Sequence, residues 1–423
     1  MKKKLLASMM TAALAVGSLA ACGPKDNTTS STDNGSTDSG ENKPEKLVVW
    51  EDKDRGPAIE AAIKSFEEKY GIKVEYKEVP MLDQQDKLRL DGPNRTGADV
   101  VTLPHDRIGP LVTEGLIVPL HVDEEVVNQF TESSIQAMTF DGELYGLPKS
   151  TETPVLIYNK ALLEKAPETM DELYSFAKDF SKDGKYGFLA LWDNFYFAHG
   201  VIGGFGGYVF GDDNGVPNPQ DLGLNNDGAV EGAEYIAKWY QEGLFPNGII
   251  GENGGQTLDG LFTEGKVAAV MNGPWAFQGY REAGIDIGVA PLPTLPNGEH
   301  VKTFIGVKGW YVSSFSKHPE WAQKLVEHIT NAENAKIRFE LTGEIPPVKS
   351  LIEDPVIAED EAASAVAIQS GYGVPMPNIP EMGEVWDPMA SALQLTVTGK
   401  QEPAKALDEA VKAIGQQIQT NHQ

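Results

Sequence analysis

The sequence predicts an α/β fold. Short apolar runs that suit buried strands alternate with segments whose apolar residues recur at helical spacing, which is the pattern of βαβ units. The clearest example is the apolar run at residues 267–271, which leads into the turn signal Asn272-Gly273 and then into Pro274. Proline suits the first turn of a helix, so a strand-to-helix turn is expected here. From Met170 onwards the pattern becomes more helical.

The first half of the folded region is expected to alternate strands with helical segments. Ile59, Ala62 and Phe66 recur at helical spacing, which predicts an amphipathic helix over residues 57–70 that ends at Gly71. Alternating or continuous apolar patterns predict strands over residues 46–50, 72–79, 98–103 and 155–158.

Later segments are predicted to be mainly helical. Apolar stripes indicate helices over residues 172–180, 229–240 and 404–418. The glycine-rich run at residues 203–207 is not followed by Lys-Ser or Lys-Thr, so we interpret it as a helix end and turn rather than a phosphate-binding loop. Neither an internal repeat nor a proline-rich linker divides the folded region.

Residues 1–21 have the features of an export signal. Three lysines at positions 2–4 precede an apolar stretch over residues 5–20. The segment ends in Leu19-Ala20-Ala21-Cys22, which resembles a bacterial lipobox, so cleavage would leave Cys22 carrying a diacylglycerol. The alternative is an ordinary export signal with an incidental cysteine. Because Cys22 is the only cysteine, an internal disulfide cannot form.

Residues 22–45 are expected to form a lipidated tether. The segment is rich in Ser, Thr, Asp, Asn and Gly, so it cannot bury a core and should be disordered. As a flexible coil it would span about 25 Å from end to end. We therefore expect an extracytoplasmic protein that is anchored to the outer face of the cell membrane through Cys22, with no later membrane span.

Charge and motif content exclude several functions. A formal charge of −27 argues against nucleic acid or anionic lipid as a partner, since both require clustered Lys and Arg. The seven histidines contain no HExxH or comparable metal-ligand spacing, and no Gly-x-Ser-x-Gly elbow is present. We therefore expect no metal site, no cofactor and no catalytic residues.

Six short motifs follow one another along the chain. They are LVVW at residues 47–50, HDR at 105–107, LIYNK at 156–160, GGY at 206–208, NGPWA at 272–276 and MPNIP at 376–380. In this order they resemble maltose/maltodextrin-binding proteins, the extracytoplasmic solute-binding subunits of ABC importers. The resemblance extends from about Lys46 to the C-terminal helix.

This resemblance implies a two-lobed periplasmic-binding-protein-like fold of type II, with a ligand cleft between the lobes and several hinge crossings. Residues 46–150 and 305–357 would form the first lobe, and residues 151–304 and 358–423 the second. The crossings are expected near residues 149–154, 302–305 and 355–361. The implied function is capture of maltose or malto-oligosaccharides by a monomer, which then delivers them to the membrane subunits of an ABC permease.

Oligosaccharide binding requires two kinds of side chain. Carboxylates and guanidinium groups form strong hydrogen bonds with sugar hydroxyls, and aromatic rings pack on the apolar faces of the sugar. The motif matches assign polar ligand contacts to Asp52, Asp54, Arg55, Asp106, Arg107 and Glu152. The same matches assign further contacts to Asn194, Tyr196, Phe197, Trp275 and Trp386.

Each of these residues also has a structural interpretation. Solvated surface charge is the usual state of Asp, Glu and Arg, and a local ion pair is possible for Asp106 with Arg107. Trp275 could pack its helix onto the sheet instead of stacking on a ligand. For Phe197, and for the nearby Trp192, core packing and ligand stacking are equally compatible with the sequence.

The sequence departs from the best-known enterobacterial members at several positions. Asn194 replaces a carboxylate that binds sugar hydroxyls, and Leu103 replaces a tryptophan. Asp387 and Ala390 replace a tyrosine and an arginine. These departures leave the length and identity of the ligand open.

Two alternative functions therefore remain. One is the same fold with another oligosaccharide as its ligand. The other is a secreted glycoside hydrolase in which Asp106 and Glu152 would act on opposite sides of the glycosidic bond, although no sequence spacing supports that pairing.

Overall fold

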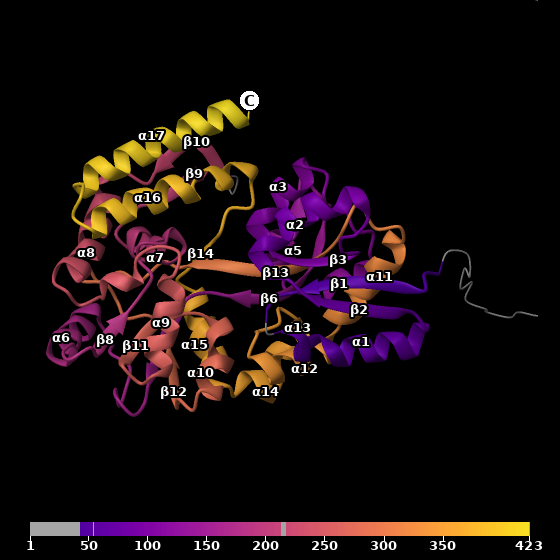
Figure 1. Cartoon of the computed structure of the whole chain (residues 1–423), viewed down its shortest axis with the longest axis horizontal. Coiled ribbons are helices and arrows are strands. Elements are labelled where there is room, and N and C mark those ends of the chain that lie inside the picture. The colour runs from indigo at the N-terminus through magenta and orange to yellow at the C-terminus, as the bar shows by residue number, and fades with distance from the viewer. Residues whose placement is uncertain (1–42, 54, 213–216, 423) are drawn as a thin grey trace, which may run out of the picture. The chain divides into compact units, whose positions relative to one another are not determined.

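The computed structural model describes residues 43–53, 55–212 and 217–422 (Figure 1). The predicted export signal, Cys22 and most of the predicted tether lie outside these residues, as does Asp54. Within the described ranges, no helix is both long enough and apolar enough to cross a membrane.

The larger sheet has the strand order β14-β13-β3-β1-β2, with β6 paired to β13. Apolar side chains of β1 and β3, among them Leu47, Val49 and Val100, are fully buried against helices on the sheet. β1 is parallel to β2 and β3, whereas β13 is antiparallel to β3 and β6. The strands are β1 (Lys46–Glu51), β2 (Lys73–Glu78), β3 (Val100–Pro104), β6 (Gly146–Glu152), β13 (Phe304–Val312) and β14 (Val374–Pro375).

Helices and short elements that accompany this sheet come from two parts of the chain. From the N-terminal part they are α1 (Gly56–Tyr70), η1 (Met81–Asp83), α2 (Gln84–Asp91), η2 (Gly92–Asn94), η3 (His105–Arg107), α3 (Ile108–Thr113), α4 (Glu124–Asn128), α5 (Glu132–Ala137), β4 (Thr139–Phe140) and β5 (Glu143–Leu144). From the later part they are α11 (Pro319–Thr330), α12 (Ala332–Thr342), α13 (Lys349–Ile352) and α14 (Pro355–Ala358). α1 packs on α11 and α12, so the early and late segments share one core.

The smaller sheet has the order β12-β7-β11-β8. β7 is antiparallel to both of its neighbours, and β8 is parallel to β11. Every residue of β11 is buried, which explains its continuous apolar sequence. The strands are β7 (Val155–Asn159), β8 (Tyr186–Leu189), β11 (Val267–Asn272) and β12 (Ile287–Ala290).

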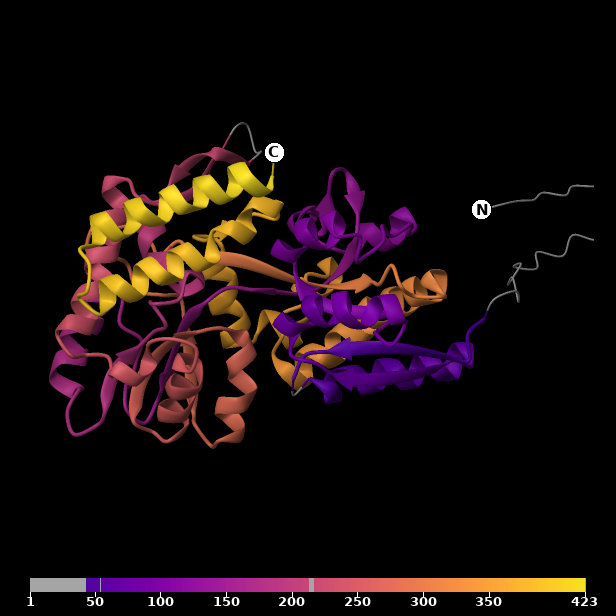
Figure 2. The ribbon, with the colours of Figure 1, turned by 45° about the horizontal axis from the view of Figure 1, so that its top comes forward.

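A larger set of helices surrounds this second sheet. They are α6 (Met170–Phe180), α7 (Phe195–Gly204), α8 (Asp227–Gln241), α9 (Gly254–Thr263), α10 (Phe277–Glu282), α15 (Glu361–Ser370), α16 (Trp386–Val397) and α17 (Pro403–Asn421), with η4 (Asn247–Ile249), η5 (Pro274–Ala276), η6 (Pro380–Glu384) and the hairpin β9 (Tyr208–Asp212) and β10 (Pro217–Gly223). α16 and α17 run side by side, as Figures 1 and 2 show in yellow.

The chain passes directly between the two sheets where β6 ends and β7 begins. The Thr153 hydroxyl lies 2.6 Å from the Thr303 hydroxyl and donates a hydrogen bond of 2.9 Å to the Phe304 carbonyl. Both connecting strands are therefore tied together at one buried point. β14 pairs with β13 in the larger sheet, although the sequence assigns residues 358–423 to the second lobe.

The predicted α/β class and the predicted elements are confirmed. The five strands at β1, β2, β3, β7 and β11 and the helices at α1, α6, α8 and α17 are present within a few residues of the expected bounds. Gly71 ends α1 with a positive φ of 62°, as a helix-ending glycine should. The sequence interpretation missed β13, because Gly306, Lys308 and Gly309 interrupt its apolar pattern.

Candidate ligand-binding site

Trp275 follows β11 in a turn that is fixed by buried polar groups. Asn272 donates from its side-chain amide to the Tyr280 hydroxyl at 2.8 Å, and its side-chain oxygen accepts from the Gly273 N–H at 2.9 Å. A Cβ at Gly273 would lie 2.1 Å from the Trp275 ring, so only glycine allows the ring to fold back over the turn. The ring is half-buried, which leaves part of its surface open to contact.

Four aromatic residues that the sequence predicts as ligand contacts belong to one cluster. Trp275 lies 6.1 Å from Tyr196 and 6.4 Å from Phe197, measured between ring centroids. Trp386 joins the cluster through Phe304, at 6.1 Å. Tyr196, Trp275 and Trp386 are half-buried, whereas Phe197 is buried. The cluster therefore offers three partly open rings, as required for packing on apolar faces of a ligand.

Two carboxylates act electrostatically on Tyr196. They are Glu152, which ends β6, and Asp106, which lies in η3 after β3. The pKa of Tyr196 is raised well above its usual value by burial first and then by these charges. Within the described residues, the Tyr196 hydroxyl and Asp106 Oδ1 are buried without a hydrogen-bond partner. Burial also raises the pKa of Asp106, although Arg107 opposes the rise. Unpaired buried polar atoms are costly, so these two are suited to a polar ligand.

His105 fixes the position of η3. Its Nδ1 accepts a hydrogen bond of 3.1 Å from the Val307 N–H, which leaves the proton on Nε2 to be donated to the Met376 carbonyl at 2.8 Å. Burial lowers the pKa of His105, so the neutral ring is favoured. Asp106 is therefore held next to a residue that connects β3, β13 and the segment after β14.

Glu152 is paired with a buried lysine. Lys308 Nζ, from the middle of β13, lies 2.7 Å from Glu152 Oε2 and 5.6 Å from the centre of the Trp275 ring. Burial raises the pKa of Glu152, and the charge of Lys308 opposes that rise. Burial disfavours the Lys308 charge, but Glu152 and Glu344 outweigh it, so the pKa of Lys308 is raised.

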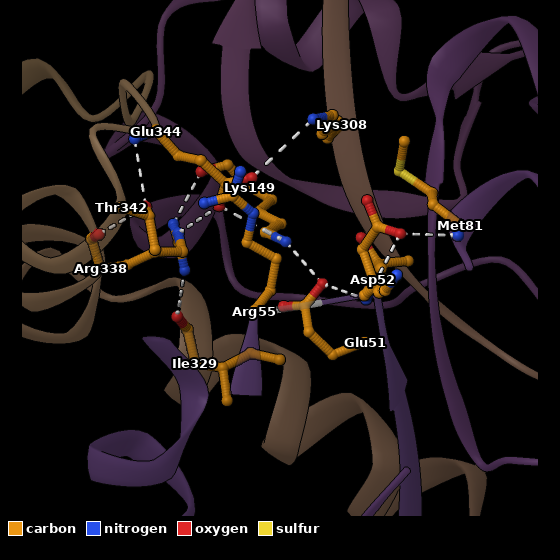
Figure 3. A network of polar contacts seen from close by, with 12 residues as sticks. Glu51, Asp52, Arg55, Met81, Lys149, Lys308, Ile329, Arg338, Thr342 and Glu344 are labelled. Carbon is orange, nitrogen blue, oxygen red and sulfur yellow. Dashed lines mark hydrogen bonds and ion pairs between the residues drawn. The ribbon is translucent and has the colours of Figure 1, made fainter. Parts of the chain in front are cut away.

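Lys308 belongs to a buried network of charges (Figure 3). Lys149 Nζ lies 2.7 Å from Glu51 and 3.5 Å from Glu344, and Lys308 lies 3.8 Å from the other oxygen of Glu344. Arg338 donates to the Lys149 carbonyl at 2.7 Å. Burial raises the pKa of Glu344, but Lys149, Lys308, Arg55 and Arg338 together lower it to about 2. Glu344 is therefore an ionised carboxylate among cations.

Several of the predicted contact residues also have partners within the chain. Asp52 accepts hydrogen bonds of 2.8 Å from the N–H groups of Met81 and Lys53. Arg55 donates from Nη2 to the Trp275 carbonyl at 2.6 Å. Asn194 is exposed and caps α7 by accepting from the Tyr196 N–H at 2.9 Å. Arg107 is half-buried and lies 3.5 Å from Asp106.

Trp192 is a core residue. Its side chain is fully buried, and its Nε1 lies 3.3 Å from the Met271 sulfur. The core interpretation is therefore correct for this tryptophan. Sequence reasoning missed Lys149, Lys308 and Glu344, although a lysine inside an otherwise apolar strand could have indicated a buried ion pair at Lys308.

Within the part of the chain that the structure describes, no group of three or more His, Cys, Asp and Glu side chains could hold a metal ion. The arrangement instead combines half-buried aromatic rings with the buried carboxylate of Asp106, the half-buried carboxylate of Glu152 and, among the described residues, a Tyr196 hydroxyl without a hydrogen-bond partner. Chemically, it can pack against an apolar face and exchange hydrogen bonds with hydroxyl groups.

Comparison with known proteins identifies similar chains. Residues 61–365 match a family described as bacterial extracellular solute-binding protein. A galactooligosaccharide-binding protein of Bacillus subtilis is 47% identical over 100% of this chain and 99% of its own length. A maltooligosaccharide ABC transporter solute-binding lipoprotein of Streptococcus pneumoniae is 35% identical over 98% of this chain and 97% of its own. A solved cyclo/maltodextrin-binding protein complexed with maltotetraose is 46% identical, with a TM-score of 0.78, and covers 91% of this chain and 100% of its own.

Proposed function

Because this chain belongs to the family of bacterial extracellular solute-binding proteins, we propose that it captures malto-oligosaccharides outside the cell and delivers them to an ABC permease. The observation that carries the proposal is the juxtaposition of Trp275 with Tyr196, whose buried hydroxyl has no partner among the described residues. Sugars present an apolar face and a rim of hydroxyls, and this arrangement matches both.

A galacto-oligosaccharide is the second candidate ligand. The similarity to the Bacillus subtilis galactooligosaccharide-binding protein, at 47% identity over the whole chain, favours it. The solved protein with maltotetraose, at 46% identity, supports the malto-oligosaccharide instead. The two ligands differ in linkage and in the orientation of hydroxyl groups, so the polar contacts of Asp106 and Glu152 would distinguish them.

The ligand is placed between two lobes that correspond to the two sheets. Asp106 and Glu152 belong to the larger sheet and its turns, whereas Tyr196, Trp275 and Trp386 come from elements around the smaller sheet. A sugar that touches both sets is enclosed when the lobes close on it. The connections near Thr153, Thr303 and residues 355–361 act as the hinge.

Binding proceeds without turnover. Hydrolysis of a glycosidic bond needs one carboxyl group that donates a proton and a second on the other side of the bond. Burial raises the pKa of Glu152, but the ammonium of Lys308, 2.7 Å from Oε2, opposes protonation of the carboxyl group, so Glu152 is better suited to accept hydrogen bonds than to donate a proton. The similar proteins are named as binding proteins, which supports binding without hydrolysis for this chain.

The protein is attached to the membrane by diacylglyceryl Cys22 and presents its loaded form to the permease. One acyl chain binds a bilayer only marginally, but two give stable attachment. The Streptococcus pneumoniae relative is named as a lipoprotein, which supports this assignment.

Calorimetric titration against a panel of sugars tests the proposed ligand. We expect maltotriose or maltotetraose to bind with a Kd of about 1 μM or tighter. Galactotriose bound more tightly than either would favour the second candidate. If no oligosaccharide in the panel binds, the proposed function is wrong.

A further inference from the structure

Lys308 is an unusual residue for the middle of a central strand. Its neighbours in β13 are apolar or glycine, and its side chain is about 5% exposed. Taking an ammonium group out of water is unfavourable unless partners compensate for it. Its nearest partner is Glu152 at 2.7 Å, and its ammonium lies over Trp275, so both contacts involve predicted ligand residues.

We propose that Lys308 is a positioning residue that presents Glu152 to the ligand as an ionised, oriented hydrogen-bond acceptor. This inference rests on the proposed function, because it concerns how the same site accepts sugar hydroxyls. The ammonium holds one carboxylate oxygen, Oε2, and leaves the other oxygen for a second contact. Glu344 Oε1, at 3.8 Å, is a second carboxylate partner of the same ammonium.

The charges of the network explain why the Lys308 ammonium matters for Glu152. Two buried carboxylates, Glu51 and Glu344, and the half-buried Glu152 face the cations of Lys149, Lys308, Arg338 and Arg55. Removal of Lys308 takes away the cation that is paired with Glu152, in a region of low dielectric. Glu152 is the group that should then bind a proton more readily, because burial already raises its pKa and Lys308 is the largest opposing influence.

The groups that face Glu152 come from several elements. Lys308 approaches from β13, Lys149 from β6 and Glu344 from the turn after α12. Tyr196 of α7 interacts electrostatically with it. Among these named groups, Lys149 is the cation that remains to favour the ionised form without Lys308, while Glu344 opposes it. The carboxyl group should therefore take up a proton at higher pH, and a protonated Glu152 accepts sugar hydrogen bonds less well.

The first experiment measures the Kd for maltotriose, or for the sugar that the wild type binds best, between about pH 8 and pH 5. Lys308→Met should lose affinity at a higher pH than the wild type, with binding about tenfold weaker near pH 6. Lys336→Met is the matched control, because Lys336 of α12 pairs with Asp354 at the same 2.7 Å but has a half-buried side chain and is outside the contacts of Glu152. The control should follow the wild-type profile. A Lys308→Met profile that coincides with the wild type would overturn the proposal.

A second comparison remains informative if Lys308→Met folds poorly. The double variant Lys308→Met with Glu152→Gln removes one charge of each sign and so leaves the net charge of the network unchanged. If Lys308 acts through Glu152, the double variant should bind within about twofold of Glu152→Gln alone and show the same pH profile. A double variant that binds far more weakly than Glu152→Gln would mean that Lys308 contacts the ligand itself or only supports the fold.

A ligand-free measurement separates this inference from the proposed function. Carbon-13 NMR of the glutamate carboxyl groups, assigned with Glu152→Gln, reports the protonation of Glu152 directly. Its titration midpoint should be higher in Lys308→Met than in the wild type, and an unchanged midpoint contradicts the proposal. If the wild type binds no sugar but the Glu152 midpoint is higher in Lys308→Met, the proposed function is wrong. The inference that Lys308 keeps Glu152 ionised would still be supported.

Discussion

Arg55 Nη2 donates a hydrogen bond of 2.6 Å to the main-chain oxygen of Trp275, which is 220 residues later in the chain. Arg55 Nη1 also donates to the Gln278 side chain at 3.3 Å. These bonds join the segment after β1 in the larger sheet to the turn that carries the Trp275 ring. Arg55 is 8% exposed, so its buried guanidinium is hydrogen-bonded to that turn, and its charge also helps to lower the pKa of Glu344.

Arg55→Gln should weaken sugar binding about tenfold, because a charge-assisted hydrogen bond that orients Trp275 is lost. Calorimetric titration checks the prediction. Arg281→Gln is the control, since Arg281 is an exposed residue of α10 whose guanidinium lies over Phe277 and outside this contact. Equal affinities for Arg55→Gln and the wild type would mean that this bond has no influence on the ligand site.

Trp275→Ala should mainly weaken sugar binding, whereas Trp192→Ala should mainly lower the stability of the fold. Trp275 is half-buried, so its removal should cost roughly 2 kcal/mol of binding free energy with less effect on folding. Trp192 is fully buried, so its removal should cost about 3–5 kcal/mol of the free energy of unfolding. Urea unfolding and calorimetric titration of both variants separate the two outcomes. A Trp275→Ala protein that binds normally and unfolds much more easily would make Trp275 a core residue.

The contrast between these two tryptophans shows what the sequence can predict. Local sequence patterns are sufficient to predict the strand β11, the turn at Asn272-Gly273 and the α/β class, because each of these depends on residues that are neighbours in the chain. They left Trp192 undecided, because its burial depends on β11 and on Trp239, which lies 5.7 Å away in α8. Whether a ring is open or buried is decided by tertiary packing, which spacing alone does not encode.

The hydrogen-bond partners of the polar site residues also depend on tertiary packing and could not be predicted from the sequence. The motif match selected Asp106 and Glu152, and both lie near Tyr196. It also selected Asp52 and Arg55, whose hydrogen bonds go to main-chain groups of Met81 and Trp275. A carboxylate at a strand end can accept from a backbone N–H, from a ligand or from both, and its backbone partners depend on distant parts of the chain that the sequence pattern does not place.

His199 should make stability depend on pH. Its ring stacks on Phe304 at 3.8 Å between centroids, and its Nδ1 donates to the Lys302 carbonyl at 3.1 Å. Burial lowers the pKa of His199 to about 4. Between pH 6.5 and 4 the unfolded chain therefore binds a proton that the folded protein does not, so stability falls as pH falls through this window, by about 3 kcal/mol for this residue.

Urea unfolding at several pH values tests this prediction. His199→Gln should lose much less stability than the wild type between pH 6.5 and 4, because glutamine does not titrate. His121→Gln is the control, since His121 is exposed, and it should keep the wild-type dependence. If the free energy of unfolding falls equally with pH in His199→Gln and in the wild type, His199 is not the source of the pH dependence.

Cys22→Ala should release the protein from the membrane. The substitution removes the sulfur that would carry the diacylglycerol. The two acyl chains of that diacylglycerol are expected to be the membrane anchor of the protein. Fractionation of cells, followed by detection of the protein in the membrane and soluble fractions, measures the change. Retention of Cys22→Ala in the membrane fraction would contradict a lipid anchor at this position.

One intact oligosaccharide should contact both Asp106, in the turn after β3 of the larger sheet, and Trp386, in α16 beside the smaller sheet. Calorimetric titration of Asp106→Asn and Trp386→Ala with maltotriose, followed by chromatography of the recovered sugar, measures this contact. We expect one sugar per wild-type protein, at least about tenfold weaker binding in each variant, and maltotriose recovered unchanged. Affinity that depends on only one of the two residues would mean that the sugar is not held between the two lobes, and conversion of the sugar to shorter products would mean that the protein is a hydrolase.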